Sequence, residues 1–119
     1  MPSRRQHRVN DLLREELSDL IQRDLRDPRL SGLTSITEVS VTADLRSAKV
    51  FVSTLGGEEQ QDAAVQGLSA AASHLRRELK VRLRTMKYVP FMTFYRDDSI
   101  EEGARLLDLM KEADDAIPS

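Results

Sequence analysis

The sequence predicts a two-layer α+β domain in which helices pack on one face of a small sheet. Apolar residues recur at helical spacing in three segments, alternate at strand spacing in two, and form a short aromatic run at 91–95. The resulting order is helix, strand, strand, helix, strand, helix, which fits a layer of helices over one sheet. A chain of 119 residues is long enough for a single core of this kind.

The first helix is predicted over 7–24. Its apolar positions recur every three or four residues, at Val9, Leu12, Leu13, Leu17, Leu20 and Ile21. Pro28 ends the helix because it disfavours helical dihedral angles at Asp27, and residues 27–32 then form a turn.

Two strands follow as a predicted hairpin. In the first, Val39 and Val41 alternate with polar residues, and in the second the same is true of Ala48, Val50 and Val52. A short connection around Asp44–Arg46 joins them. Ile36 is out of phase with the first strand, which predicts a bulge or a strand entered from the other face.

The next helical stretch keeps its apolar phase from about Asp62 to Met86, and Pro90 is expected to end it. One straight helix of this length would measure about 40 Å, whereas a typical strand measures only ~17–20 Å. A straight helix would therefore overhang the sheet. We predict a break within two residues of Ala72, in the small-residue run Ala71, Ala72 and Ser73.

A third strand is predicted from Phe91 to Tyr95. We expect Phe91, Phe94 and Tyr95 to lie in the core and Phe51 to be the best candidate for an exposed ring. Ser99 and Glu102 fit a capping box that opens a last, acidic helix packed on the three-stranded sheet. The predicted organisation is a single domain over 1–114 with a frayed tail at 115–119.

Basic residues gather on one side of the second half of the predicted long helix. The members of this basic stripe are Arg76, Arg77, Lys80, Arg84 and Lys87. From 74 to 96 there are seven lysines and arginines and one acid, whereas 97–119 hold eight acids and two bases. A row of cations matches the spacing of a phosphate backbone. The alternative is an ordinary solvated helix face.

The residue types exclude several classes of function. The chain has no cysteine, so a disulfide framework and thiolate chemistry are absent. Its two histidines, His7 and His74, show no motif of a general base, and Gly56–Gly57 lacks the lysine of a phosphate-binding loop. No apolar run approaches the ~20 residues of a membrane span. We expect a cytoplasmic protein that is not an enzyme and needs no cofactor, metal or small-molecule substrate.

Four stretches, in this order and spacing, resemble the ribosome-binding factor A family of bacterial small-subunit assembly factors. They are Asp27–Leu30, Val39–Val52, Val89–Phe94 and Asp97–Ile100, within a resemblance that extends from about Arg4 to Met110. The resemblance implies a type II KH-like fold, α-β-β-α-kink-α-β, with the C-terminal helix added. It also implies binding to small-subunit ribosomal RNA and the free 30S subunit, late maturation of 16S rRNA and growth in the cold. We expect the factor to be a monomer.

The resemblance also implies an Ala-x-Gly kink at positions 71–73, where this chain has Ser73 in place of glycine. The expected RNA-binding residues are those of the amino terminus, the break and the basic stripe: Arg4, Arg5, Arg8, Ser73, His74, Arg76, Arg77, Lys80, Arg84 and Lys87. The alternative function is a protein-interaction module whose acidic last helix docks a basic partner. The two readings differ in salt dependence, since phosphate contacts make binding strongly salt-dependent.

Overall fold

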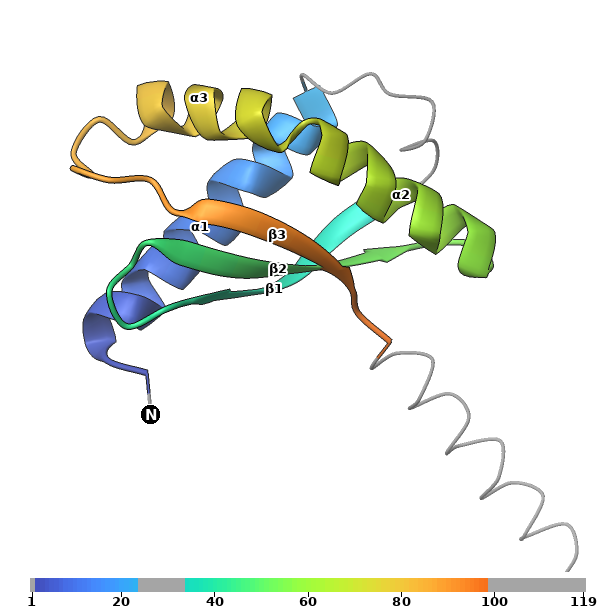
Figure 1. The fold of residues 1–119 in the computed structure, drawn as a ribbon, viewed down its shortest axis with the longest axis horizontal. Helices are drawn as coiled ribbons and strands as arrows, with labels where there is room; N and C mark the ends of the chain where they lie inside the picture. The colour runs from blue at the N-terminus through green and yellow to red at the C-terminus, as the bar shows by residue number, and fades with distance from the viewer. Residues whose placement is uncertain (1, 24–33, 99–119) are drawn as a thin grey trace, which may run out of the picture.

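The computed structural model describes residues 2–23 and 34–98 (Figure 1). In chain order the elements are α1 (Arg4–Arg23), β1 (Thr34–Val41), β2 (Ser47–Thr54), α2 (Glu58–Ala70), α3 (Ala72–Arg82) and β3 (Phe91–Arg96). This order confirms the predicted α+β fold class. The predicted turn at 27–32, the last helix and the tail at 115–119 lie outside the described residues.

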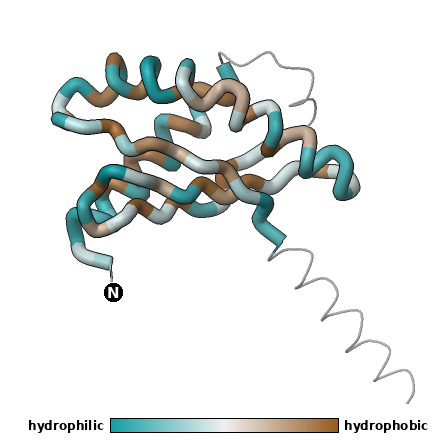
Figure 2. Tube along the Cα trace, in the orientation of Figure 1, coloured by the Kyte–Doolittle hydropathy of each residue, from teal (hydrophilic) through white to brown (hydrophobic). Residues whose placement is uncertain are grey.

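The three strands form one mixed sheet in the order β1-β2-β3. The β1–β2 pair is the predicted antiparallel hairpin, while β3 pairs with β2 in parallel. Buried residues of all three strands occupy one face, on which Val50 lies between Val39 of β1 and Phe94 of β3. The helices supply the other half of this core through buried leucines. Hydrophobic and hydrophilic positions alternate along each helix, as expected for elements with one buried side (Figure 2).

Helix α1 begins at Arg4, three residues earlier than predicted. Ser3 and Gln6 form a reciprocal cap: Ser3 Oγ accepts from Gln6 N at 3.1 Å, and Gln6 Oε1 accepts from Ser3 N at 2.8 Å. Asn10 Oδ1 accepts from Val41 N at 2.8 Å, which ties the first turns of α1 to the end of β1. The Ser-x-x-Gln spacing at 3–6 indicates this helix start in the sequence. The prediction used apolar periodicity instead, and these two polar residues do not contribute to it.

Strand β1 contains the predicted bulge. The register shifts between Ile36 and Glu38, so that Ile36 pairs with Val52 and Val39 with Val50. The extra residue, Thr37, allows Ile36 and Val39 both to face the core despite their odd spacing. The hairpin therefore buries every apolar residue of β1.

The long helical stretch is broken at Ala71, within the predicted range. Ala71 has φ −90° and ψ 1°, and its N–H donates to the carbonyls of both Gly67 and Leu68 at 3.1 Å. Leu68 before the break and Leu75 after it are both fully buried. The break thus lets both halves pack against the same sheet, without a glycine at position 73.

Helix α3 ends at Arg82, so the prediction that it continues to Pro90 was wrong. Leu83 leaves the helix with φ −109° and ψ 54°. The chain must return from the helix to the edge of the sheet, where the Phe91 N–H donates to the Arg46 carbonyl at 2.9 Å. Continuing the helix to Pro90 would carry the chain roughly 12 Å farther along the helix axis. Residues 83–90 therefore form a connection, called here the 83–90 connection.

The aromatic residues of β3 are also placed differently from expectation. Phe94 is buried, but Phe91 and Tyr95 are 58% and 41% exposed. The two exposed rings lie out of phase with the buried Met92 and Phe94 along the strand, so they do not face the core. Phe51 is half-buried, with its ring centre 5.8 Å from that of Tyr95.

Candidate nucleic-acid interface

The exposed side of α3 carries part of the predicted basic stripe. Arg77 and Lys80 are exposed on the helix, and Arg84 is exposed in the turn that follows it. We call these three residues the α3 row. The fully buried Leu79 marks the opposite side of the helix.

Ser73 and His74 are exposed in the first turn of α3, next to the break. They lie on the same helix as Arg77 and Lys80, as expected.

Arg76 does not join this row. Its side chain is half-buried, and its Nε donates to the Val89 carbonyl at 2.9 Å. The guanidinium lies over two rings, 3.9 Å from the centre of Phe91 and 5.2 Å from that of Tyr88. These contacts hold the Arg76 side chain against the 83–90 connection. Its guanidinium therefore stabilises the junction of α3 with that connection and lies apart from the α3 row.

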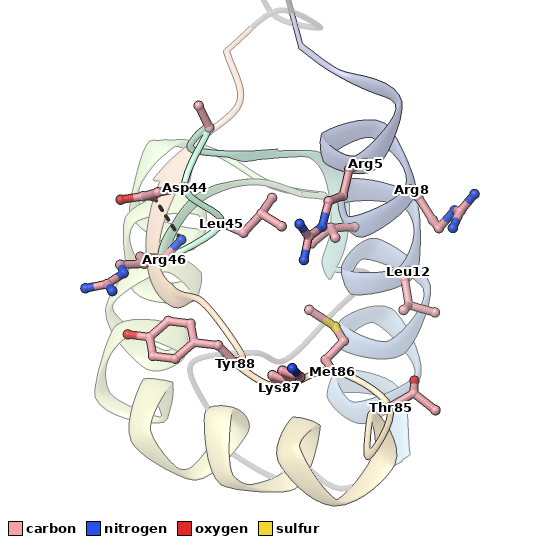
Figure 3. Close-up of a pocket in the computed structure, with 12 residues that line it drawn as sticks. Arg5, Arg8, Leu12, Asp44, Leu45, Arg46, Thr85, Met86, Lys87 and Tyr88 are labelled. Atoms are coloured by element: carbon pink, nitrogen blue, oxygen red, sulfur yellow. Dashed lines mark hydrogen bonds between the residues drawn. The ribbon is translucent and has the colours of Figure 1, made fainter.

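A groove brings together three of the remaining predicted cations. It has a volume of about 720 Å³ and lies between the start of α1, the β1–β2 turn and the 83–90 connection (Figure 3). Arg5 and Arg8 from α1 and Lys87 from the connection line it. Arg5 points toward the opening, whereas Arg8 extends outward from α1 (Figure 3). Arg4 is exposed at the start of α1 and is not among the lining residues.

The groove contains a fourth cation, Arg46, that the sequence reasoning missed. Arg46 is exposed in the β1–β2 turn, and its side chain points away from the opening (Figure 3). Its position depends on the parallel pairing of β2 with β3, which brings the turn beside the 83–90 connection. This long-range pairing leaves no local sequence signal at Arg46.

One carboxylate, Asp44, lines the groove together with the four cations. Asp44 Oδ1 accepts a hydrogen bond from Thr42 Oγ1 at 2.6 Å and another from the Arg46 N–H at 3.1 Å. These two bonds, with the Thr42 bond contributing most, hold the pKa of Asp44 below its ordinary value. Asp44 therefore stays ionised at neutral pH and orders the turn, while the groove keeps an excess of positive charge.

Two other arginines are balanced by acids within the fold. Arg82 Nη1 lies 2.5 Å from Asp19 Oδ2 and 3.4 Å from Glu16 Oε2, joining α3 to α1. The hydrogen bond with Asp19 raises the pKa of Arg82, and the same bond lowers the pKa of Asp19. Arg82 is thus an interhelical bridge, although it lies within the basic segment of the sequence.

Arg96 lies among three carboxylates at the end of β3. It lies 3.1 Å from both Asp62 and Asp98 and 3.9 Å from Glu58. Burial opposes its charge, but the hydrogen bond to Asp62 and the nearby carboxylates leave the pKa of Arg96 raised. This cluster joins β3 to α2.

Within residues 2–23 and 34–98, by contrast, no acidic side chain forms an ion pair with a member of the α3 row or with Arg5 or Lys87. These cations are therefore available to an external anion. The same described ranges hold no group of three or more histidines and carboxylates suited to a metal ion. No helix in these ranges is long and apolar enough to cross a membrane.

Comparison with known proteins identifies relatives over nearly the whole chain. Residues 5–110 match the family model described as ribosome-binding factor A. A ribosome-binding factor A from Acetivibrio thermocellus is 48% identical over 105 residues, which cover 88% of this chain and 85% of that protein.

Solved structures agree with this relationship. A solution structure from Thermotoga maritima, described as a putative ribosome-binding factor A, matches with a TM-score of 0.71 and 31% identity, covering 85% of this chain and 94% of that one. A Thermus thermophilus ribosome-binding factor A, fitted as a homology model into a map of a 30S complex, matches with a TM-score of 0.65 and 29% identity. That match covers 79% of this chain and 96% of the other. The chain described here therefore belongs to the ribosome-binding factor A family.

Proposed function

We propose that this chain is a non-catalytic assembly factor that binds small-subunit ribosomal RNA on the free 30S subunit and promotes late maturation of 16S rRNA. Family membership and the 30S complex of the Thermus relative support the partner. We infer that the factor acts as a monomer in the cytoplasm, without a cofactor.

The observation that carries the proposal is the groove. Cations from three separate segments of the chain, Arg5, Arg46 and Lys87 among them, line it with a single carboxylate. The exposed α3 row adds further cations with no acidic partner in the described residues. Charge of this kind supplies most of the affinity for a phosphate backbone.

The direct test is a titration of the full chain with free 30S subunits and small-subunit RNA at two salt concentrations. The double variant Arg5→Glu, Lys87→Glu should weaken binding and flatten the slope of log K against log salt by roughly 0.7–0.9 per lost phosphate contact. Lys49→Glu is the matched control, since Lys49 is exposed on the sheet face opposite the helices. Equal binding by wild type and double variant, or an equal loss in the control, would contradict the proposed site.

The role in maturation has its own test in cells. Cells that lack the protein should accumulate immature small subunits and grow poorly in the cold. Restoring the wild-type chain should reverse both effects, whereas the Arg5→Glu, Lys87→Glu variant should not. Normal subunit profiles at low temperature in the deletion strain would contradict the assembly role.

The alternative, docking of a basic partner through the acidic C-terminal segment, depends on residues outside the described ranges. No observation in the described part of the chain favours it.

A further inference from the structure

The groove that holds the cations also has an apolar wall. Leu12, Leu45 and Met86 line it and are each partly buried against the hydrophobic core. Leu45 from the β1–β2 turn and Met86 from the 83–90 connection point toward the opening, as does Arg5 (Figure 3). A phosphate alone needs no apolar contact, so the cations explain only part of this surface.

Leu45 occupies this wall in an unfavourable backbone conformation. Of the described residues other than glycine, Leu45 alone has a positive φ, at 61°. Glycine or asparagine adopts this region readily, whereas a bulky residue such as leucine is an outlier there. The turn holds it in place, since the Leu45 N–H donates to the Thr42 carbonyl at 2.9 Å and Asp44 bonds to Thr42 and Arg46.

Backbone strain of this kind is concentrated at functional sites, where the surrounding structure enforces it. The side chain held in this strained conformation points into the groove (Figure 3), where it can contact a ligand. The apolar wall and the cations together match the two surfaces of a nucleotide, a base face and a phosphate.

We propose that the groove receives one unpaired nucleotide of the bound RNA, with its base against Leu45 and Met86 and its phosphate beside Arg5 and Lys87. The volume of about 720 Å³ lies within the range of ~300–1,000 Å³ of pockets that hold small ligands. Proteins that read RNA do so mainly at unpaired bases that leave the stack. The inference rests on the proposed RNA binding and adds the place where a single base is held.

The test compares two probes of equal length: a short single-stranded RNA of mixed sequence and an abasic ribose-phosphate chain. The wild-type chain should bind the RNA about tenfold more tightly than the abasic chain, because only the RNA can bury a base face against the apolar wall. Leu45→Gly should reduce RNA binding to the abasic level and leave binding of the abasic chain unchanged. Leu45→Met should retain the preference for RNA, because it keeps an apolar side chain in the wall.

Each outcome decides the inference. Equal affinity of the wild type for both probes, or an equal loss of both in Leu45→Gly, overturns the nucleotide site while leaving phosphate binding intact. Failure of the wild type to bind either probe also overturns the inference, whereas the titration with 30S subunits decides the proposed function separately. Competition by a free nucleoside monophosphate as strong as that by the RNA would assign the groove to a soluble nucleotide and also overturn the inference.

The folded state of each variant is checked by thermal unfolding. Leu45→Gly relieves the positive φ, so it should unfold cooperatively near the wild-type temperature. If it does not, Met86→Gln changes the same wall from the 83–90 connection, where Met86 is only partly buried. Met86→Gln should then show the same selective loss of RNA binding, and retention of the full preference would overturn the proposal.

Discussion

Arg76 and Phe91 are stacked across the junction of α3 and β3, with the guanidinium carbon 3.9 Å from the ring centre. The same guanidinium group donates from Nε to the Val89 carbonyl at 2.9 Å. One side chain thus fixes both the backbone just before β3 and the first ring of the strand. This relationship removes Arg76 from the predicted basic stripe and gives it a structural role.

Replacement of Arg76 should therefore affect folding before it affects RNA binding. Arg76→Ala loses a charged hydrogen bond and a cation–π contact, which together contribute about 2–4 kcal/mol to the free energy of unfolding. Urea denaturation measures this change. Arg77→Ala, one residue along the helix and exposed, is the control and should change stability by no more than ~0.5 kcal/mol. A fully stable Arg76→Ala variant with weakened RNA binding would show that Arg76 contacts RNA.

The α3 row should contribute to RNA binding with little effect on stability. Charge reversal at Arg77, Lys80 and Arg84 should weaken binding to small-subunit RNA, because three exposed cations become anions. Each change should alter the free energy of unfolding by no more than ~0.5 kcal/mol, since all three side chains lie on the surface. A folded triple variant with unchanged affinity for small-subunit RNA would contradict the assignment of the α3 row to RNA binding.

The loop between β2 and α2 contains two adjacent glycines that should respond differently to alanine. Gly56 has φ +132°, and a Cβ there would lie 2.9 Å from Gln60 Cγ. Gly56→Ala should therefore destabilise the fold by about 1–3 kcal/mol. Gly57 is the matched control, because its φ is −81° and an added Cβ would lie 3.5 Å from Gln60 Oε1. Thermal unfolding measures the stability of both variants. An equal loss of stability in Gly56→Ala and Gly57→Ala would contradict this account.

The Asp19–Arg82 bridge should make stability depend on pH in acid. The hydrogen bond from Arg82 lowers the pKa of Asp19 in the folded state. The unfolded chain therefore takes up a proton first as pH falls below about 4. The contribution of the bridge is present above that pH and is lost as pH falls through the folded pKa.

Unfolding temperatures of wild type and Asp19→Asn should accordingly differ at neutral pH and converge below about pH 4. Asp11→Asn is the control on the same helix, since Asp11 is exposed and forms no ion pair within the described ranges. The difference in unfolding temperature between Asp11→Asn and wild type should not decrease in this way as pH falls. A constant gap between wild type and Asp19→Asn across the acid range would argue against the bridge.

The elements that sequence reasoning located correctly are those set by local patterns. Alternation revealed the hairpin, the odd spacing of Ile36 and Val39 revealed the bulge, and the length of the apolar phase required the break at Ala71. The hairpin and the bulge are determined by residues close together in the chain, and the break follows from the length of one continuous helical phase. Periodicity failed at Leu83, where the chain leaves the helix although its apolar phase continues.

The candidate interface was only partly predictable, because local patterns do not show which distant segments meet. The sequence identified Arg5, Arg8 and Lys87 as RNA-binding candidates, but treated Lys87 as part of a helical stripe with Arg76. The structure instead places Lys87 in a groove with the α1 arginines and Arg46. These residues come together because segments far apart in the chain pair with one another. A helical projection considers one segment at a time and cannot show this.

The parallel pairing of β3 has a consequence for the order of folding events. Phe51 in β2 pairs with Glu38 across a short hairpin, but with Tyr95 only after the chain has passed through both α2 and α3. Closing the longer loop costs more entropy, so the hairpin should form first and β3 should join the sheet last. Phe94→Leu should then raise the unfolding rate more than it lowers the refolding rate in stopped-flow measurements. The wall and cations of the groove, which need β3 in place, would assemble only in this final step.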